Sequence, residues 1–503
     1  ANFKTASADK DAGAAFLKYK DFKPYVDYFN SMEDENIAQA IPNARASQWM
    51  EENIPLFECS QKNFEEMYYY RWWTLRKHIK ETPVGYGMTE FLVNRSYADK
   101  YNLIACAIGH HIYESRWLRN PEYLNQIIHT WYRGNEGGPM AKMTKFSSWN
   151  ADAVLGRYMV DGNKEFLLDM VKDLEAEYAR WEKTNRLPNG LYWQGDVQDG
   201  MEESISGGRR KQYARPTINS YMYGNAKALS LIGIMTGDEG MAMKYGLKAD
   251  SIKTLVQDKL WNTDHHFFET MRGDASAEVR EAIGYIPWYF NLPDASSKYT
   301  VAWKEVMDEK GFSAPYGLTT AERRHPEFRT HGVGKCEWDG AIWPFASAQT
   351  LTAMANFMNN YPQTVLTDSV YFHHMERYVE SQHHRGRPYI GEYLDEVTGY
   401  WLKGDQERSR YYNHSTFNDL MITGLIGLRP RMDNTVEVNP LIPEGKWDYF
   451  CLDNVLYHGR NLTILWDKDG SRYQRGKGLH IYVDGKEVGH SDTLTRVLCE
   501  NVL

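Results

Sequence analysis

The chain lacks any long hydrophobic run, since none of its 503 residues lies in a stretch that approaches the ~20 consecutive apolar residues of a membrane-spanning helix. It also lacks low-complexity tracts, and its 42% hydrophobic and 25% charged residues are typical of a globular protein. A net charge of -9 without a basic run argues against a nucleic-acid surface. These absences exclude a membrane span and a nucleic-acid partner.

Cysteine is scarce as well. The five cysteines are widely separated, at Cys59, Cys106, Cys336, Cys451 and Cys499. Their spacing matches neither a disulfide framework nor a zinc site. The adjacent histidines at 110–111, 265–266, 373–374 and 383–384 have no third ligand at useful spacing, so we predict no metal. The first residue is Ala1, which is consistent with a removed export signal, and we expect a periplasmic or secreted location, otherwise a cytoplasmic one.

Aromatic residues, in contrast, are abundant. Sixteen Trp and 35 Tyr occur in a chain whose mean hydropathy is -0.63. Aromatic rings stack on the C–H faces of sugars, while their N–H and O–H groups bond to hydroxyls. Core packing would account for most of these rings, and the remainder indicates a carbohydrate ligand.

Residues 61–430 are predicted to form repeated pairs of helices, about a dozen in all. In the segment 164–184, six apolar residues lie on one stripe: Leu167, Met170, Val171, Leu174, Tyr178 and Trp181. Other helices are predicted over 95–118, 121–133, 341–360 and 363–384, and from Ile218 to a turn at Gly237. The chain is therefore predicted to be mainly α, with residues 1–60 as a leading segment packed on the helical domain.

The pattern changes after Pro430. Apolar residues alternate with polar ones over 462–466 and again over 479–483, and the second run leads into Asp484-Gly485. Such alternation into an Asp-Gly pair is a strong signal for a β-hairpin. We therefore predict a small β module over residues 431–503, with a structural role.

The segment 191–208 interrupts the helices with aromatics, acids and a closing Gly207-Gly208 pair. A general acid at neutral pH needs a shielded carboxyl, and neighbouring carboxylates raise its pKa further. Asp196, Asp199, Glu202 and Glu203 are all candidates for that role. A solvated acidic turn is the alternative interpretation.

Two later segments have the same character. Residues 338–344 place an acid, Asp339, and two tryptophans at a helix entry, where backbone N–H groups are free. Asp339 could cap the helix or bind a sugar hydroxyl. Residues 391–401, followed by 411–415, again alternate acids and rings in a polar loop, which would keep a general base ionised.

These three segments resemble, in the same order, three loops of glycoside hydrolase family 63 and its mannosylglycerate-hydrolase-like relatives. Residues 392–399 (Glu-Tyr-Leu-Asp-Glu-Val-Thr-Gly) are similar to the E-x-Y-N-P-x-T-G loop of the catalytic base. Residues 200–204 (Gly-Met-Glu-Glu-Ser) resemble the S-G-M/L-D-x-S loop of the general acid, and 338–344 are similar to W-R-G-P-I-W. The resemblance covers roughly residues 60–430, and it implies an (α/α)6 barrel and an inverting mechanism.

The resemblance is not exact at several positions. Glu202 stands where the family usually has Asp, Asp339 replaces an Arg, and Leu394 and Glu396 replace Tyr and Pro. One more methylene moves the acid's carboxyl by about 1.5 Å, which demands a different position of the leaving group. The departures therefore leave the reaction class in place but not the family's substrates.

Together these features predict an inverting exo-glycosidase that needs no cofactor. Its chemistry is proton transfer around an oxocarbenium-like transition state, with Glu202 as general acid and Glu392 as general base. The residues expected to shape the sugar pocket are Trp193, Asp199, Trp338, Asp339, Trp343, Tyr393, Arg71 and Trp72. The expected partner is an oligosaccharide or glycoside, and the oligomeric state stays open.

Two other kinds of protein fit the same pattern. A sugar epimerase or a polysaccharide lyase on this scaffold would use His or Tyr as a base, and the histidine pairs are compatible with that. A carbohydrate-binding protein without catalysis is the third alternative, favoured by the Asp-to-Glu change at position 202. The sugar, its anomeric configuration and its linkage stay open.

Overall fold

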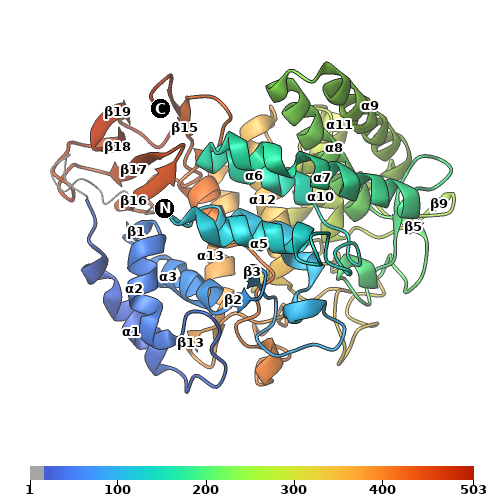
Figure 1. Cartoon of the computed structure of the whole chain (residues 1–503), viewed down its shortest axis with the longest axis horizontal. Helices are drawn as coiled ribbons and strands as arrows, with labels where there is room; N and C mark the ends of the chain where they lie inside the picture. Colours follow the sequence, from blue (N-terminus) through green and yellow to red (C-terminus); the bar gives the residue numbers. More distant parts are fainter. Residues whose placement is uncertain (1–15) are drawn as a thin grey trace.

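The computed structural model describes residues 16–503, so the first fifteen residues of the predicted leading segment lie outside the described residues. The described chain is mainly helical and has a β module at its C-terminal end (Figure 1). Its α-helices are α1 Lys23–Ser31, α2 Asn43–Asn53, α3 Lys62–Lys77, α4 Ile108–Ser115, α5 Pro121–Arg133, α6 Asn150–Asp161, α7 Lys164–Asn185, α8 Pro216–Thr236, α9 Glu239–Leu255, α10 Ile286–Tyr289, α11 Ser297–Thr300, α12 Pro344–Asn360, α13 Asp368–Ser381 and α14 Asn418–Leu420. Over residues 16–503, none of these helices combines the length and the apolar character of a membrane span.

The periodic segments form the predicted helices. Helix α7 begins after Asn163, whose side chain accepts a hydrogen bond from the backbone N–H of Phe166 at 3.0 Å, as a helix cap does. Its apolar stripe is buried, and α8 ends where Gly237 takes a positive φ of 73°. Helices α5, α12 and α13 also lie within the predicted segments.

The prediction of one helix over 95–118 is wrong. Only α4 is α-helical there, and the chain before it is irregular, with Tyr101 and Asn102 both at positive φ. The apolar residues 103–107 are nevertheless buried. Burial without a helix is possible because the loop's backbone finds its hydrogen bonds elsewhere, which a hydrophobic pattern does not reveal. Long loops also occupy much of 134–149, 186–215 and 307–343.

The contacts between helices form a closed ring. Helix α4 contacts α6, α6 contacts α8, α8 contacts α10, α10 contacts α12, α12 contacts α14, and α14 returns to α4 and α3. Helices α7, α9 and α13 pack against members of the ring. Helices α8 and α12 are buried over most of their circumference, as expected for helices enclosed by others.

The C-terminal β module is confirmed. Five antiparallel strands form its main sheet in the order β1-β16-β17-β18-β19, and the predicted alternation places Leu462 opposite Val483 and Ile464 opposite Ile481. The turn at Asp484-Gly485 has φ angles of 48° and 80°, as a two-residue hairpin turn requires. The bounds are β1 Leu56–Cys59, β16 Tyr449–Tyr457, β17 Arg460–Asp467, β18 Gly478–Val483 and β19 Lys486–Ser491, and a second sheet holds β14 Leu428–Arg429, β15 Val436–Val438 and β20 Val497–Cys499.

The N-terminal segment contributes to both parts of the molecule. Helices α1 and α2 pack on α3, whereas strand β1 forms the edge of the C-terminal sheet. The sheet meets the helices at the C-terminal end of α6, where His458 donates from its backbone N–H to Val160 O and from Nε2 to Met159 O, each at 2.7 Å. The β module therefore adjoins the end of α6 opposite to its entry loop (Figure 1).

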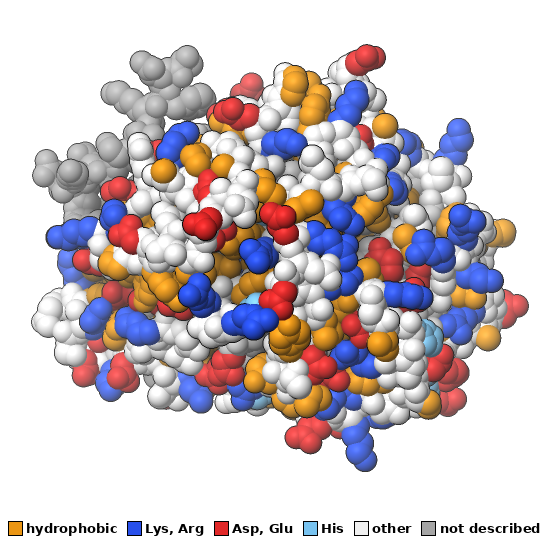
Figure 2. Space-filling model, turned by 90° about the horizontal axis from the view of Figure 1, so that it is seen from below, with side chains coloured by type: hydrophobic (Ala, Val, Ile, Leu, Met, Phe, Trp, Pro, Cys, Tyr) orange, Lys and Arg blue, Asp and Glu red, His pale blue; other side chains and the backbone are white. Residues whose placement is uncertain are grey.

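The remaining strands are short. They are β2 Ile79–Thr82, β3 Gly85–Met88, β4 Trp193–Gln194, β5 Tyr213–Ala214, β6 Trp261–Asn262, β7 Phe267–Phe268, β8 Met271–Arg272, β9 Ala275–Ser276, β10 Ser313–Ala314, β11 Gly317–Leu318, β12 His383–His384 and β13 Arg387–Pro388. Most of them close turns in the long loops. On the face shown in Figure 2, cationic and anionic side chains are interspersed rather than gathered into a patch of one sign.

Candidate active site

The three loops singled out in the sequence meet at the N-terminal ends of the ring helices. The loop before α6 joins the loop before α8 through the backbone N–H of Ser147, which donates to Gln198 O at 2.9 Å. The loop before α12 pairs with the 391–401 loop, because Ile342 and Leu394 exchange backbone hydrogen bonds of 3.1 and 3.0 Å. Residues far apart in sequence therefore share one end of the helical ring.

Glu202 and Glu392 are brought together at this end. Burial, the largest cause, and the negative charge of Glu392 together raise the pKa of Glu202 to about 7. One carboxylate influences another in this way only when both belong to the same poorly solvated site. A carboxyl with a pKa of about 7 still carries its proton in a large fraction of molecules at neutral pH.

Glu392 has a different electrostatic environment. Its burial raises the pKa, but Lys403, Arg408 and Arg95 oppose that change. The Lys403 Nζ atom lies 3.8 Å from Oε2 of Glu392. Three nearby cations favour the ionised form of this carboxylate, whereas at Glu202 the positive charge of Arg209 is opposed by the negative charges of Glu392 and Asp196.

Three of the predicted rings form a stack beside Glu392. Trp338 and Trp343 have ring centroids 4.7 Å apart, and Trp343 and Tyr393 have centroids 4.5 Å apart with planes only 16° from parallel. The indole N–H groups of Trp338 and Trp343 are buried and have no hydrogen-bond partner among the described residues. Since an unpaired buried donor costs free energy, these groups are suited to bind an incoming polar ligand.

Asp339 does not cap helix α12. Its Oδ2 accepts hydrogen bonds from the backbone N–H groups of His331 and Gly332, at 2.5 and 2.9 Å, while the helix begins after Trp343 without a side-chain cap. The other oxygen, Oδ1, is buried and has no partner among residues 16–503. Of the two roles considered for Asp339, capping is wrong and hydroxyl binding stays a prediction.

Arg71 and Trp72 are both buried, and their predicted place in a sugar pocket stays a prediction. Arg71 donates to Gln382 Oε1 at 2.8 Å and to the hydroxyl and carbonyl oxygens of Ser415 at 2.8 and 3.0 Å. Trp72 is completely buried. Helix α3 is enclosed on nearly all sides, so its rings pack in the core, and Arg71 holds the 411–417 segment in place.

Asp199 has a structural role, and its predicted contact with sugar stays a prediction. Its carboxylate is completely buried, accepts from Arg215 Nε at 2.7 Å and from the Thr217 hydroxyl at 2.6 Å, and accepts from the Ser147 hydroxyl as well. This network connects the loop that carries Glu202 to helix α8. Trp193, on strand β4, lines a separate cavity of about 320 Å³ with Trp181.

We expect Asp199→Asn to destabilise the protein. Removing one charge from a buried pair leaves Arg215 uncompensated, which costs about 3–5 kcal/mol. Urea unfolding measures the change, and Asp27→Asn, in the exposed pair with Lys23, is the matched control that should change little. Equal effects of the two substitutions would contradict the structural role of Asp199.

The sequence analysis missed several groups at this site. Glu90 follows strand β3 and accepts a hydrogen bond from the Cys106 thiol at 3.0 Å. Cys336 is partly buried, and burial together with the charges of Glu202 and Glu392 raises its thiol pKa to about 12. In the sequence, Glu90 and Cys336 stand out only as an acid and a thiol within apolar or Gly-rich segments. That feature is too common to identify a functional site.

Several of the paired histidines hold structural hydrogen bonds, whereas both ring nitrogens of the buried His110 have no partner among the described residues. His111 and His374 each donate from Nε2 to a backbone carbonyl at 2.7 Å, and burial lowers the pKa of each to about 4. His265 lies between two carboxylates, with Nδ1 2.7 Å from Glu269 and Nε2 3.1 Å from Glu278. This group is the one described set of three side chains close enough to share a metal ion, and it closes the β6–β7 turn.

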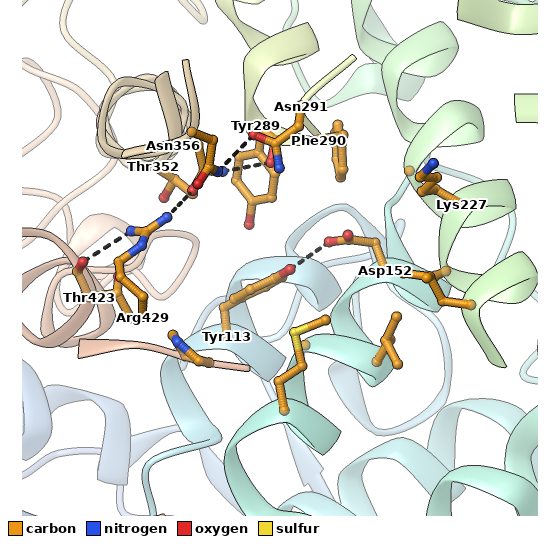
Figure 3. Close-up of a pocket in the computed structure, with 18 of the residues that line it drawn as sticks. Tyr113, Asp152, Lys227, Tyr289, Phe290, Asn291, Thr352, Asn356, Thr423 and Arg429 are labelled. Atoms are coloured by element: carbon orange, nitrogen blue, oxygen red, sulfur yellow. Dashed lines mark hydrogen bonds between the residues drawn. The ribbon is translucent and has the colours of Figure 1, made fainter. Parts of the chain in front are cut away.

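A cavity of about 610 Å³ lies at the other end of the ring (Figure 3). The C-terminal halves of α8 and α12 contribute to its wall, and none of the predicted site residues does. In Figure 3, Tyr113 donates to Asp152 at 2.6 Å, and Arg429 is held by Asn356 and Thr423. Trp149 separates the two ends, since its N–H donates to the Tyr289 hydroxyl of the cavity at 3.1 Å while its ring packs on Phe345.

The comparison with known families decides the identity of the chain. The family model described as "Mannosylglycerate hydrolase MGH1-like glycoside hydrolase domain" matches residues 100–415, more than half of the chain. The chain belongs to this MGH1-like family of glycoside hydrolases. Residues 428–490 match the C-terminal domain of glycosyl hydrolase family 65, which coincides with most of the β module.

Solved structures agree with this placement of the MGH1-like chain. A structure named "Sialidase" is 83% identical with a TM-score of 0.98, and it covers 99% of this chain, which spans only 46% of that protein. The GH63 mannosylglycerate hydrolase from Thermus thermophilus, in complex with glucose, is 12% identical, with a TM-score of 0.53 over 71% of this chain and 99% of its own. An α-L-rhamnosidase from Dictyoglumus thermophilum is 12% identical, with a TM-score of 0.52 over 86% and 44%. The last two show a likeness of fold alone.

Proposed function

We propose that this glycoside hydrolase is an inverting exo-glycosidase whose helical ring is an (α/α)6 barrel. Glu202 protonates the departing glycosidic oxygen, and Glu392 deprotonates the water that attacks the opposite face of the sugar. The observation that carries the proposal is the pairing of two carboxyls in one site with unlike surroundings. Burial and a negative neighbour hold the proton on Glu202, while three cations favour charge on Glu392.

The unpaired polar groups around the two carboxyls support a sugar as the ligand. Trp338 and Trp343 offer buried indole N–H donors, and Asp339 offers a buried acceptor. The stacked rings beside them supply apolar surface for C–H faces. This combination favours a hydroxylated ring held in one orientation, as an exo-acting enzyme requires at the terminal sugar.

A panel of aryl glycosides and oligosaccharides tests the reaction. Hydrolysis releases a reducing end without ultraviolet-absorbing unsaturation, which separates it from the epimerase and lyase alternatives. Proton NMR of the first product then shows whether its anomeric configuration is inverted, and release of single sugars shows exo-action. A product with retained configuration would overturn the inverting assignment. Sialosides belong in the panel because the 83% identical structure is named "Sialidase".

The pH dependence should have an alkaline limb close to neutrality. Glu202 must be protonated to act, and its pKa is raised to about 7, so kcat/KM for unactivated substrates should fall as the pH rises through about 7. The acidic limb should lie above the ordinary range of a glutamate, because the pKa of Glu392 is raised by burial. A pH–rate profile of the purified enzyme measures both. A flat profile between pH 6 and 9 would contradict the assignment of Glu202.

A further inference from the structure

Glu90 is a buried acid that the two-carboxylate mechanism does not use. Its side chain is 3% exposed, and the Cys106 thiol donates to Oε1 at 3.0 Å. Its backbone carbonyl accepts from the N–H of Asn413 at 2.9 Å. Both the backbone and the carboxyl of Glu90 are therefore held in place.

The position of Glu90 is between the two catalytic loops. Cys106, which holds its carboxyl, packs against Gly200 on the loop of Glu202, where an added Cβ would lie 3.3 Å from the Cys106 Cβ. On the other side, the ring of Phe91 meets the ring of Tyr412 edge to face at 4.4 Å. Glu90 is thus attached to the loop of Glu202 and to the 411–415 segment, whose Tyr412 donates from its backbone N–H to Ile390 O at 3.3 Å, two residues before Glu392.

The charges around Glu90 are unfavourable for a third carboxylate. Its pKa is raised to about 8, mainly by burial and further by the negative charges of Glu392 and Glu202, against the opposing hydrogen bonds of Cys106 and Tyr412. No lysine or arginine among the described residues forms an ion pair with it, although Arg95 acts on the neighbouring Glu392. Tyr97, which is 37% exposed, is another titratable neighbour, and its pKa is raised by partial burial and by the charge of Glu90.

We propose that Glu90 is the third carboxyl of the active site and that, as a neutral acid, it donates a hydrogen bond to a hydroxyl group of the substrate sugar. The inference rests on the proposed glycosidase function. The Cys106 thiol contacts Oε1, which leaves Oε2 as the oxygen that would carry the O–H group toward the substrate. A neutral donor avoids a third negative charge beside Glu202 and Glu392. Glu90 therefore selects the sugar rather than transferring a proton.

Two substitutions of Glu90 separate a neutral donor from an ionised group. Glu90→Ala removes the donor, and we expect kcat/KM for the best glycoside of the panel to fall by about 10²-fold, mostly through KM. Glu90→Gln supplies an amide N–H at the same place, so it should recover most of that loss. If Glu90→Gln is as damaging as Glu90→Ala, the proposal is overturned, because the reaction then needs the carboxyl's charge or its transferable proton.

The pH profile supplies a readout that a merely structural role would not change. On an aryl glycoside with a good leaving group, the proton of Glu202 is dispensable, so the remaining alkaline limb should follow Glu90 near pH 8. Glu90→Gln should remove that limb. An unchanged limb would overturn the proposal, and this test stands even if Glu90→Ala does not fold.

The controls distinguish failure of this inference from failure of the proposed function. Lys227→Ala, in the cavity at the other end of the ring, should leave both the rate and the limb as in the parent enzyme. Thermal unfolding checks that each variant is folded. If the parent enzyme is inactive on every glycoside of the panel, the proposed function is wrong. If it is active but Glu90→Gln keeps the alkaline limb of the pH–rate profile, only the role of Glu90 is wrong.

Discussion

Glu392→Gln should suppress turnover of every glycoside, activated or not, by a factor on the order of 10² to 10⁴. The amide cannot accept a proton from the attacking water, and this step is needed whatever the leaving group is. The three cations that favour the ionised carboxylate would then face a neutral group. Initial rates on an aryl glycoside and on an oligosaccharide measure the loss.

Azide sharpens this test of Glu392. As an anion it attacks without deprotonation, so it should restore part of the turnover of Glu392→Gln and yield a glycosyl azide. Glu407→Gln, an exposed glutamate in the same region of the chain, is the matched control and should behave as the parent enzyme. Near-normal hydrolysis by Glu392→Gln without azide would rule out Glu392 as the base.

Glu202→Gln should produce a loss that depends on the leaving group. The leaving group of an oligosaccharide is an alkoxide, and the proton of the general acid offsets its developing negative charge. The rate of oligosaccharide hydrolysis should therefore fall by about 10²-fold or more. The leaving groups of aryl glycosides and glycosyl fluorides depart without that proton. The variant should therefore keep much of the parent enzyme's rate of hydrolysis on these substrates. The ratio of kcat/KM for the two substrate types, compared between variant and parent, measures the effect.

The neighbouring Glu203 offers the matched control for Glu202. It lies on the same loop at a positive φ of 67°, partly exposed, with Lys335 Nζ 3.7 Å away. We expect Glu203→Gln to act on both substrate types as the parent enzyme does. Equal losses on both types for Glu202→Gln, with a selective loss for Glu203→Gln, would move the acid to Glu203. Loss of the alkaline limb near pH 7 in Glu202→Gln would agree with the present assignment.

The local elements could be read from the sequence where one physical signal dominates. The stripe of α7 and the alternation around Asp484-Gly485 predicted a helix and a hairpin, because a single buried face leaves a period in the sequence. The segment 103–107 shows the limit of that reasoning. Its apolar residues are buried in irregular chain, and burial alone does not specify a helix.

For the candidate site, too, the sequence could predict one part and not another. Motif resemblance predicted Glu202 and Glu392 as the catalytic carboxyl groups, and membership of the MGH1-like family agrees with the reaction class. It could not tell Asp199 from Glu202, since both are acids on one loop. Only the fold decides that Arg215 neutralises Asp199 while burial beside Glu392 keeps a proton on Glu202.

The sequence by itself determined the helical and β segments, the carbohydrate chemistry and the order of the three loops, because these follow from local patterns of residue type. Only the tertiary structure decided which acids share a site, that Arg71 and Trp72 belong to the core, and that Glu90 and Cys106 lie between the catalytic loops. The physical reason is that pKa, burial and pairing depend on neighbours in space. Glu90 and Glu392 are some three hundred positions apart in the chain, yet the charge of one acts on the other.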